Sequence, residues 1–167
     1  KKFFKNAEIE IPFYQNDIEN LSKWFLKIKG LDSIRKENII VDLKNTYKKS
    51  KKSSRIKIIE KINQYSLIKY DNINDYIDTI DNNNFSLTPI DLTLLSEKYK
   101  IGFILITNKY SEKYNCMIIG KEEDNNVFLV LYHHNDYKDK DEFKLGCIKI
   151  NNKYINMKYI RYEMKLS

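Results

Sequence analysis

The sequence is poor in residues on which several classes of function depend. It contains four glycines in 167 residues, which excludes the glycine-rich loops that hold nucleotide phosphates. Its two cysteines, Cys116 and Cys147, lie far apart among apolar residues and match neither a disulfide framework nor a zinc site. We therefore expect no metal and no cofactor, and we interpret the two thiols as buried and reduced.

Long apolar runs are also absent. No run approaches the roughly 20 residues that a membrane-spanning helix needs. The opening Lys1-Lys2-Phe3-Phe4-Lys5 is not followed by the apolar stretch of a signal peptide. We expect an intracellular protein with no membrane partner. The chain begins without an initiator methionine, which is consistent with a fragment or a processed piece of a larger protein.

Arginine is scarce within a formal net charge of +7, with only Arg35, Arg55 and Arg161 in the chain. Positive charge attracts phosphates and acidic partners, but recognition of phosphates and bases favours the guanidinium fork. Lysine, asparagine and isoleucine are used heavily, and Ala7 is the only alanine. This usage is typical of AT-rich coding, which raises the lysine content whatever the function. The basic balance is therefore weak support for a nucleic-acid partner.

What the sequence does contain is 42% hydrophobic residues with clear periodicity, which is enough for one packed core. Apolar residues recur at helical spacing through the first half of the chain. We predict helices over residues 15–28 with a stop at Gly30, over 33–47, along a stripe of Ile56, Ile59 and Ile62, over 73–80, and from Thr88-Pro89-Ile90-Asp91 onward. In the last of these, Thr88 is a helix cap and Pro89 fits the first helical position.

The second half changes to short apolar runs that are typical of strands. We predict strands over residues 101–107, 116–120, 127–132, 143–150 and 153–157, with a hairpin turn at 122–126. The carboxyl-terminal tyrosines Tyr154, Tyr159 and Tyr162 indicate either a packed terminal helix or a stacking surface. The pattern predicts one α+β domain over residues 1–167 with a core of about 15–157, in which a helical half packs on a mainly antiparallel sheet of about five strands.

Residues 48–55 form the sharpest break in composition and predict a solvated basic loop whose serines cap the next helix. The same run is a candidate site for nucleic acid or an acidic partner, with the candidate residues Lys48, Lys49, Lys51, Lys52 and Arg55. Only Tyr47 lies next to it as an aromatic that could stack on a base.

The histidine pair His133-His134 follows the apolar run 127–132. Neighbouring residues on a strand point to opposite faces, so we expect exposed residues at a strand end and not two ligands of one site. The alternative is a catalytic histidine paired with Cys116 or Cys147. Neither cysteine opens a helix or lies beside a basic cluster, the settings that lower the pKa of a thiol.

The order of elements carries a resemblance. A helix from Arg55, a short helix around Tyr76, the helix that begins at Thr88, and the strands at 101–107 and 127–132 follow one another in this order. This order resembles the ovarian-tumour (OTU) fold of papain-like cysteine proteases. It is similar in particular to OTU-like segments in large proteins of giant DNA viruses, where D-x-x-x-L-S-x-K-Y introduces the buried strand; here that pattern runs from Asp91 to Tyr99. The AT-rich coding agrees with such a source.

The resemblance implies where catalytic residues would lie, and the chain departs from the family there. OTU enzymes carry Asp-Gly-x-Cys at the start of the first core helix, whereas residues 13–20 here contain neither glycine nor cysteine. The family's histidine precedes an aromatic near the final strands; residues 141–144 keep Phe143 and lack the histidine. Because cysteine and histidine act jointly, the loss of either removes nearly all turnover.

These observations predict a non-catalytic OTU-like pseudoenzyme domain that serves as a protein-interaction or structural module. The resemblance implies a viral protein, associated with the virion or with replication, in the host cytoplasm or the virion. Ubiquitin and a virion component are the candidate partners. A nucleic-acid-binding domain that uses residues 48–55 and the basic carboxyl terminus is the first alternative. A cysteine-type deubiquitinase or protease is the second.

Overall fold

The computed structural model describes residues 8–10, 16–26, 28–66, 68–106, 116–120, 128–134, 144–149 and 159–162. The α+β class is confirmed, because helices dominate the first part of the chain and strands the second. The elements, in chain order, are β1 (Glu8–Glu10), α1 (Asp17–Phe25), α2 (Lys36–Lys49), α3 (Lys52–Tyr65), α4 (Ile73–Ile77), α5 (Pro89–Tyr99), β2 (Gly102–Ile106), β3 (Cys116–Ile119), β4 (Phe128–His134), β5 (Lys144–Lys149) and β6 (Tyr159–Tyr162).

The described strands form a mixed sheet with the order β1-β5-β4-β2-β3-β6. The pairs β1–β5, β2–β3 and β4–β5 are antiparallel, whereas β2–β4 and β3–β6 are parallel. A mainly antiparallel sheet of about five strands is therefore not confirmed. The predicted hairpin between β3 and β4 is wrong, because β2 lies between them in the sheet. Residues 122–126 lie outside the described part of the chain.

Two strands were not predicted from the sequence. β1 is three residues long and has glutamate at both ends, so its pattern is too short to stand out. β6 contains Tyr159 and Tyr162, so a terminal helix over these residues is wrong. The predicted strand at 153–157 lies outside the described residues. Both strands pair at the rims of the sheet, β1 with β5 and β6 with β3.

The start of α5 follows the local chemistry predicted from the sequence. Thr88 Oγ1 accepts a hydrogen bond from the Asp91 N–H at 3.4 Å, and Asp91 Oδ2 accepts one from the Thr88 N–H at 2.8 Å. This reciprocal pair satisfies two backbone donors at the helix start, and Pro89 occupies the first helical position. Lys100, with φ of 56°, ends the helix in the left-handed conformation.

The ends of other helices moved from their predicted positions. α1 ends at Phe25, and tight turns carry the chain through Ile28 and Leu31 around Gly30, whose φ of 90° suits glycine. The predicted basic loop at 48–55 is wrong: α2 continues to Lys49, and α3 already begins at Lys52. We call residues 48–55 the α2–α3 corner.

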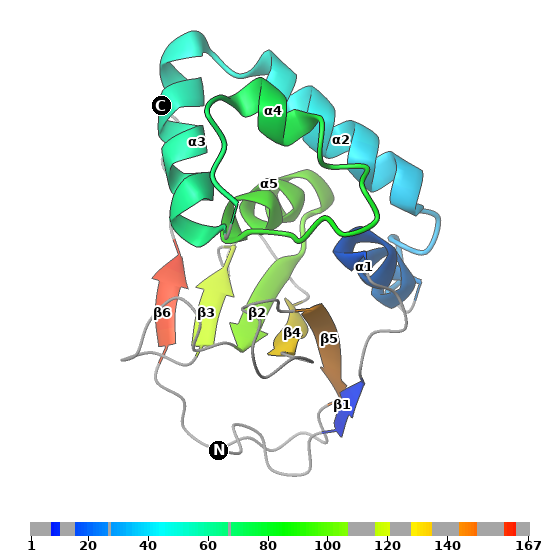
Figure 1. The fold of residues 1–167 in the computed structure, drawn as a ribbon. Coiled ribbons are helices and arrows are strands. Elements are labelled where there is room, and N and C mark those ends of the chain that lie inside the picture. Colours follow the sequence, from blue (N-terminus) through cyan, green and yellow to red (C-terminus); the bar gives the residue numbers. More distant parts are fainter. Residues whose placement is uncertain are drawn as a thin grey trace.

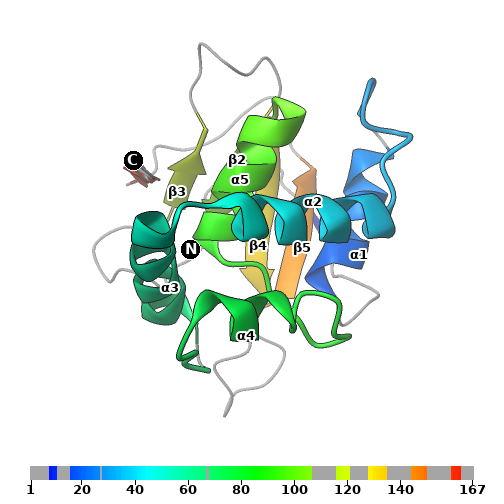
Figure 2. The ribbon, with the colours of Figure 1, turned by 90° about the horizontal axis from the view of Figure 1, so that it is seen from above.

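The core lies between the helices and the sheet. Figure 1 shows the five helices gathered at one end of the molecule, and Figure 2 shows α5 over the strands with α1 beside β5. α5 lies against β2 and β3, and α1 lies against β5. Full burial of a large apolar side chain contributes about 1.5–3 kcal/mol, so this interface supplies much of the stability. The fully buried residues of the core as a whole include Ile18, Leu21, Phe25, Ile39, Ile62, Ile80, Ile90, Leu92 and Phe103.

Candidate functional site

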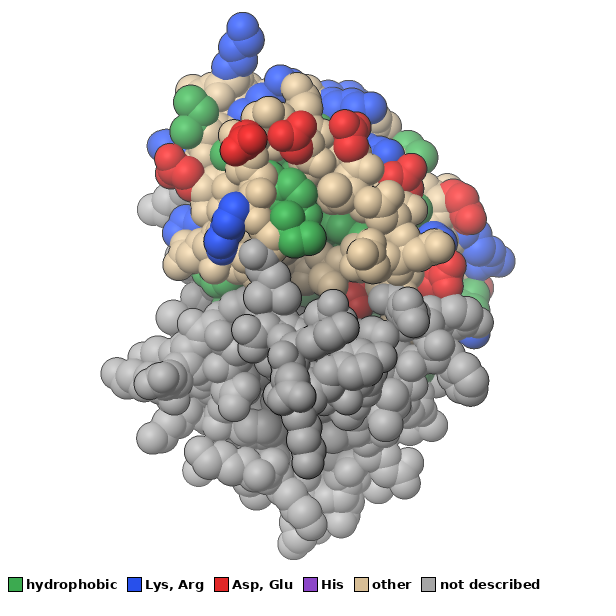
Figure 3. All heavy atoms as spheres, in the orientation of Figure 1, with side chains coloured by type: hydrophobic (Ala, Val, Ile, Leu, Met, Phe, Trp, Pro, Cys, Tyr) green, Lys and Arg blue, Asp and Glu red, His purple; other side chains and the backbone are tan. Residues whose placement is uncertain are grey.

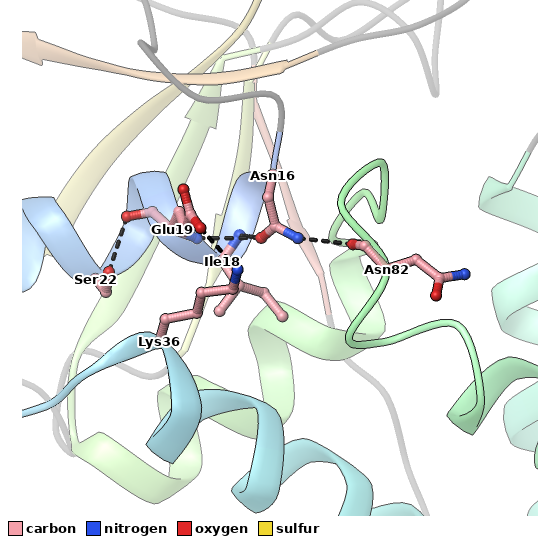
Figure 4. A network of polar contacts seen from close by, with 6 residues as sticks. All are labelled: Asn16, Ile18, Glu19, Ser22, Lys36 and Asn82. Atoms are coloured by element: carbon pink, nitrogen blue, oxygen red, sulfur yellow. Dashed lines mark hydrogen bonds and ion pairs between the residues drawn. The ribbon is translucent and has the colours of Figure 1, made fainter.

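The start of α1 is the first place to look for a site, because the OTU resemblance would put a cysteine there. Asn16 caps this helix, and its Oδ1 accepts hydrogen bonds from the N–H groups of Ile18 at 2.8 Å and Glu19 at 3.1 Å. Its Nδ2 donates to the carbonyl oxygen of Asn82 at 2.8 Å, in the turn that follows α4 (Figure 4). Both ends of the Asn16 amide are engaged, so the chain's own groups close the start of the helix.

Asp17 strengthens this closure. Its side chain is 1% exposed, and Oδ2 accepts a hydrogen bond from the Leu87 N–H at 2.9 Å, just before α5. A carboxylate at this position is favoured by the positive end of the helix dipole. Glu19 pairs with Lys36 at 2.7 Å and ties α1 to the start of α2 (Figure 4). The start of α1 is therefore a structural joint between three segments.

The catalytic histidine that the resemblance implies would lie near β5, because the family's histidine precedes an aromatic residue near the final strands. The start of α1 and β5 belong to neighbouring elements, because α1 lies against β5. Residues 13–15 and 141–143, which include Phe143, lie outside the described part of the chain. Within residues 16–20, which are described, the functional groups are amides and carboxylates and not a thiol.

The strand register places the two cysteines relative to the two histidines. Cys147 in β5 lies opposite Leu131 of β4, whereas His133 and His134 lie opposite Leu145 and Lys144. Cys116 belongs to β3, which β2 separates from β4. The backbone register thus brings neither cysteine opposite a histidine. His133 and His134 are the last two residues of β4, which confirms the predicted strand-end position.

A second cluster of polar side chains centres on Asp91 at the start of α5. Its carboxylate accepts hydrogen bonds from the Tyr47 hydroxyl of α2 and, at 2.5 Å, from the Tyr76 hydroxyl of α4. It also accepts one from Thr88 Oγ1 at 3.0 Å, besides the backbone bond of the cap. One carboxylate therefore joins α2, α4 and α5. Sequence analysis placed Asp91 at the start of this helix, with Thr88 as the cap, but found neither the part of Asp91 in the cap nor its two tyrosine partners.

Burial decides the electrostatics of this cluster. Desolvation raises the pKa of Asp91 above its ordinary value, although the hydrogen bonds from Thr88, Tyr47 and Tyr76 favour the charged form and oppose the shift. Burial and the neighbouring Asp91 raise the pKa of Tyr76 well above its ordinary value. Asp91 is 0% exposed and Tyr76 is 1% exposed, so neither group can meet a substrate. The cluster is an internal support, and we assign it no chemistry.

The lysines of the candidate basic run are brought together at the α2–α3 corner. Lys48 and Lys49 lie in the last turn of α2, Lys51 is the N-cap of α3, and Lys52 is its first residue. All four are exposed. The predicted capping by serine is wrong: Ser53 and Ser54 lie within α3, and Lys51 makes no side-chain cap.

Arg55, the fifth candidate residue, has a different position. It is half-buried, and its Nη2 donates to the carbonyl oxygen of Lys48 at 2.5 Å, while its Nε donates to that of Ser50 at 3.1 Å. These carbonyls belong to the end of α2, where helical carbonyls lack partners within the helix. Arg55 therefore holds the two helices together at the corner.

Sequence analysis missed the residues that extend the basic corner along α3. Ile56 was assigned to a buried stripe with Ile59 and Ile62, and this is wrong, because Ile56 is 64% exposed. The buried positions are Ser54, Ile58, Ile59 and Ile62. Spacings of three and four from Ile62 back to Ser54 would have identified this stripe. The exposed residues of α3 around the remaining helix surface include Ile56, Lys57, Glu60 and Lys61.

Comparison with known proteins adds no identification. No family model matches the sequence, and no curated protein is significantly similar to it. Among the residues that the structure describes, no three side chains of His, Cys, Asp or Glu gather closely enough to hold a metal ion. The helices within those residues are all too short or too polar to cross a membrane.

Proposed function

We propose that the chain is a non-catalytic OTU-like domain that serves as a protein-interaction or structural module, in a virion- or replication-associated protein of a giant DNA virus. The observation that carries the proposal is the closed start of α1. Asn16 occupies the N–H groups of Ile18 and Glu19, and Asp17 holds the Leu87 N–H. A catalytic cysteine at this position needs a helix start that is open to a substrate.

The arrangement of elements supports the OTU-like part of the proposal. The helices α3, α4 and α5 precede β2 and β4 in the order on which the resemblance rests. α1 lies against β5, as two elements must when one carries a cysteine and the other follows a histidine. An OTU-like order of elements, with Asn16 and Asp17 at the start of α1 in place of a cysteine, fits a domain of this kind that does not catalyse hydrolysis.

The absence of turnover is tested with ubiquitin that carries a carboxyl-terminal electrophile, mixed with the intact chain. We expect no covalent adduct at Cys116 or Cys147, whereas an active OTU enzyme used as the positive control forms one. The variants Cys116→Ser and Cys147→Ser provide the internal control. An adduct that one of these variants abolishes would contradict the proposal and favour a cysteine protease.

Binding is tested separately with unmodified ubiquitin, the first candidate partner, by recording nuclear magnetic resonance spectra of the labelled chain during a titration. We expect concentration-dependent shifts that saturate, with no cleavage of diubiquitin in the same tube. If ubiquitin causes no shifts, ubiquitin is excluded, and purified virion proteins are titrated in the same way. A chain that binds none of them is not an interaction module.

A further inference from the structure

We propose that the outward side of α3, continued by the α2–α3 corner, is a docking surface for an acidic protein partner. This α3 face consists of six lysines, Lys48, Lys49, Lys51, Lys52, Lys57 and Lys61, together with Ile56 and one acidic residue, Glu60. The inference rests on the proposed function and deepens it, because it names the surface and the chemistry of the partner. Figures 1 and 2 both place α3 at the outer edge of the helical part, where no other helix covers its outward side.

The centre of the α3 face is apolar. Ile56 is 64% exposed, although isoleucine is among the residues most often buried in proteins. Helical spacing places Lys52 one turn before Ile56 and the exposed Glu60 one turn after it on the same side, and Lys57 follows Ile56 directly. An apolar side chain with a charged rim is the usual anatomy of a protein interface, in which the central residue enters a pocket of the partner.

Among the described residues, the lysines of the α3 face have no ion-pair partner. Lys36 and Lys44, on α2, pair with Glu19 at 2.7 Å and Asp81 at 3.3 Å. In contrast, no carboxylate of the described residues pairs with the six lysines of the α3 face, although Glu60 lies on the same helix. Figure 3 shows acidic and basic side chains mixed over the visible face of the helical part.

The position of two lysines adds to the positive potential. Lys51 and Lys52 lie at the amino-terminal end of α3, which is the positive end of the helix dipole, and the first turn has no acidic residue. Cations at this end are unfavourable for the helix itself. A carboxylate from a partner would relieve this repulsion and accept hydrogen bonds from the N–H groups of the first turn, since α3 has no side-chain cap.

These features fit a protein better than a nucleic acid. Tyr47, the aromatic next to the run, is 0% exposed and donates its hydroxyl hydrogen to Asp91, so it cannot stack on a base. Arg55 uses its guanidinium on the carbonyls of Lys48 and Ser50. Ile56 has no role in contacts with phosphate. Arg55 also holds the corner rigid, so little conformational entropy is lost when a partner binds.

The test measures binding of fluorescent probes to the intact chain by anisotropy. The first probe is a 20-residue peptide in which glutamates surround leucines at helical spacing. The second is a 20-residue polyglutamate, and the third is a 20-nucleotide poly-dT strand. We expect the glutamate–leucine peptide to bind more tightly than polyglutamate, because only the former offers an apolar contact to Ile56, and poly-dT to bind more weakly than the glutamate–leucine peptide.

Variants locate the binding on the chain. We expect Ile56→Ser and the double variant Lys57→Glu/Lys61→Glu each to weaken binding of the glutamate–leucine peptide by about tenfold, as for residues at the centre of an interface. The matched controls are Val41→Ser, which removes another exposed apolar side chain, and Lys29→Glu/Lys98→Glu, which makes the same change in net charge on α5 and beyond α1. We expect these controls to bind the peptide as the parent chain does.

Three outcomes would overturn the inference: no binding of the peptide, equal loss of binding in the α3 and control variants, or poly-dT binding as tight as that of the peptide with no effect of Ile56→Ser. The last outcome would favour a nucleic-acid-binding surface. The anisotropy assay reports on the α3 face, whereas the electrophilic probe and the ubiquitin titration report on the thiols and on partner binding in general. Each proposal can therefore fail while the other stands.

Discussion

Two polar regions of the helical part differ in how their charges are used. Around Asp91 and at the start of α1, buried carboxylates contact segments distant in sequence: Asp91 accepts a hydrogen bond from Tyr47, and Asp17 accepts one from the Leu87 N–H. At the α2–α3 corner the lysines are exposed, and the side chain of Arg55 donates hydrogen bonds to carbonyls only five and seven residues away. The first region holds the fold together, whereas the second is open to a partner. Stability and binding should therefore respond to different substitutions.

The largest effect is expected for Asp91→Ala. Removal of this carboxylate leaves the hydroxyl groups of Tyr47 and Tyr76 buried without their acceptor and abolishes one half of the α5 cap. We expect the free energy of unfolding to fall by about 3–5 kcal/mol, as when one partner of a buried polar network is removed. Urea unfolding followed by circular dichroism measures it. The exposed Asp71→Ala is the control, and an equal loss there would show that Asp91 is not special.

A matched pair within α3 sharpens the comparison. Ile62 is 0% exposed and Ile56 is 64% exposed, although both lie on the same helix. We expect Ile62→Ala to cost about 2–5 kcal/mol of unfolding free energy and Ile56→Ala to change it by no more than about 0.5 kcal/mol. Thermal and urea unfolding of the two variants under one set of conditions measures both changes in the free energy of unfolding. Similar losses in both would mean that Ile56 packs against the protein.

The pH dependence of unfolding tests the buried cluster without a change in size of any side chain. The pKa of Tyr76 is raised in the folded state, so the contribution of its neutral hydroxyl is fully present below the unfolded value of about 10 and is lost as the pH rises through the folded value. We expect the free energy of unfolding to fall above pH 10 by up to about 1.4 kcal/mol per pH unit for this group. Tyr76→Phe should remove that part of the slope. If the slope is unchanged in Tyr76→Phe, the pH dependence arises from another group.

The smallest effect is expected on the α3 face. Reversal of charge in Lys57→Glu/Lys61→Glu should alter the free energy of unfolding by no more than about 0.5 kcal/mol, because exposed charges contribute little to stability. The midpoint of urea unfolding measures this change. The same variant is expected to lose peptide binding, so the two measurements together separate the regions. A loss of several kcal/mol would mean that these lysines support the fold.

Helices whose ends depend on local chemistry were predicted well. The start of α5 is predictable from Thr88, Pro89 and Asp91, because the cap that they form uses groups within four residues of one another. The start of α3 was misplaced because Lys51 caps it without a side-chain hydrogen bond, and nothing in a lysine pair signals a helix start. The serines that suggested a cap, Ser53 and Ser54, lie within the first turn of the helix.

The sheet was predicted less well. Apolar runs located β2, β3, β4 and β5, but their order along the chain suggested that neighbours in sequence pair with each other. β2 instead separates β3 from β4 and pairs with β4 in parallel. Apolar composition indicates that a strand is buried, but it does not indicate which strand pairs with it. The edge strands β1 and β6 are too short to show the alternation of apolar and polar residues that identifies a strand.

The candidate site divides in the same way. The exposure of Lys48, Lys49, Lys51 and Lys52 follows from their charge and was predicted. The position of Arg55 was not, because its acceptors are carbonyls that become unpaired only when α2 ends at Lys49. The tyrosine partners of Asp91 lie 15 and 44 residues away in sequence, so no local pattern could identify them.

The sequence by itself determined the α+β class, the existence of the main helices and strands, and the lack of a cysteine at the start of α1, because these depend on residue type and on spacing within a few residues. Only the tertiary structure decided the strand order, the burial of Asp91 among two tyrosines, and the outward position of Ile56 beside a lysine-rich corner. Each of these depends on which distant segments come into contact, and side chains acquire burial and partners only when that contact forms.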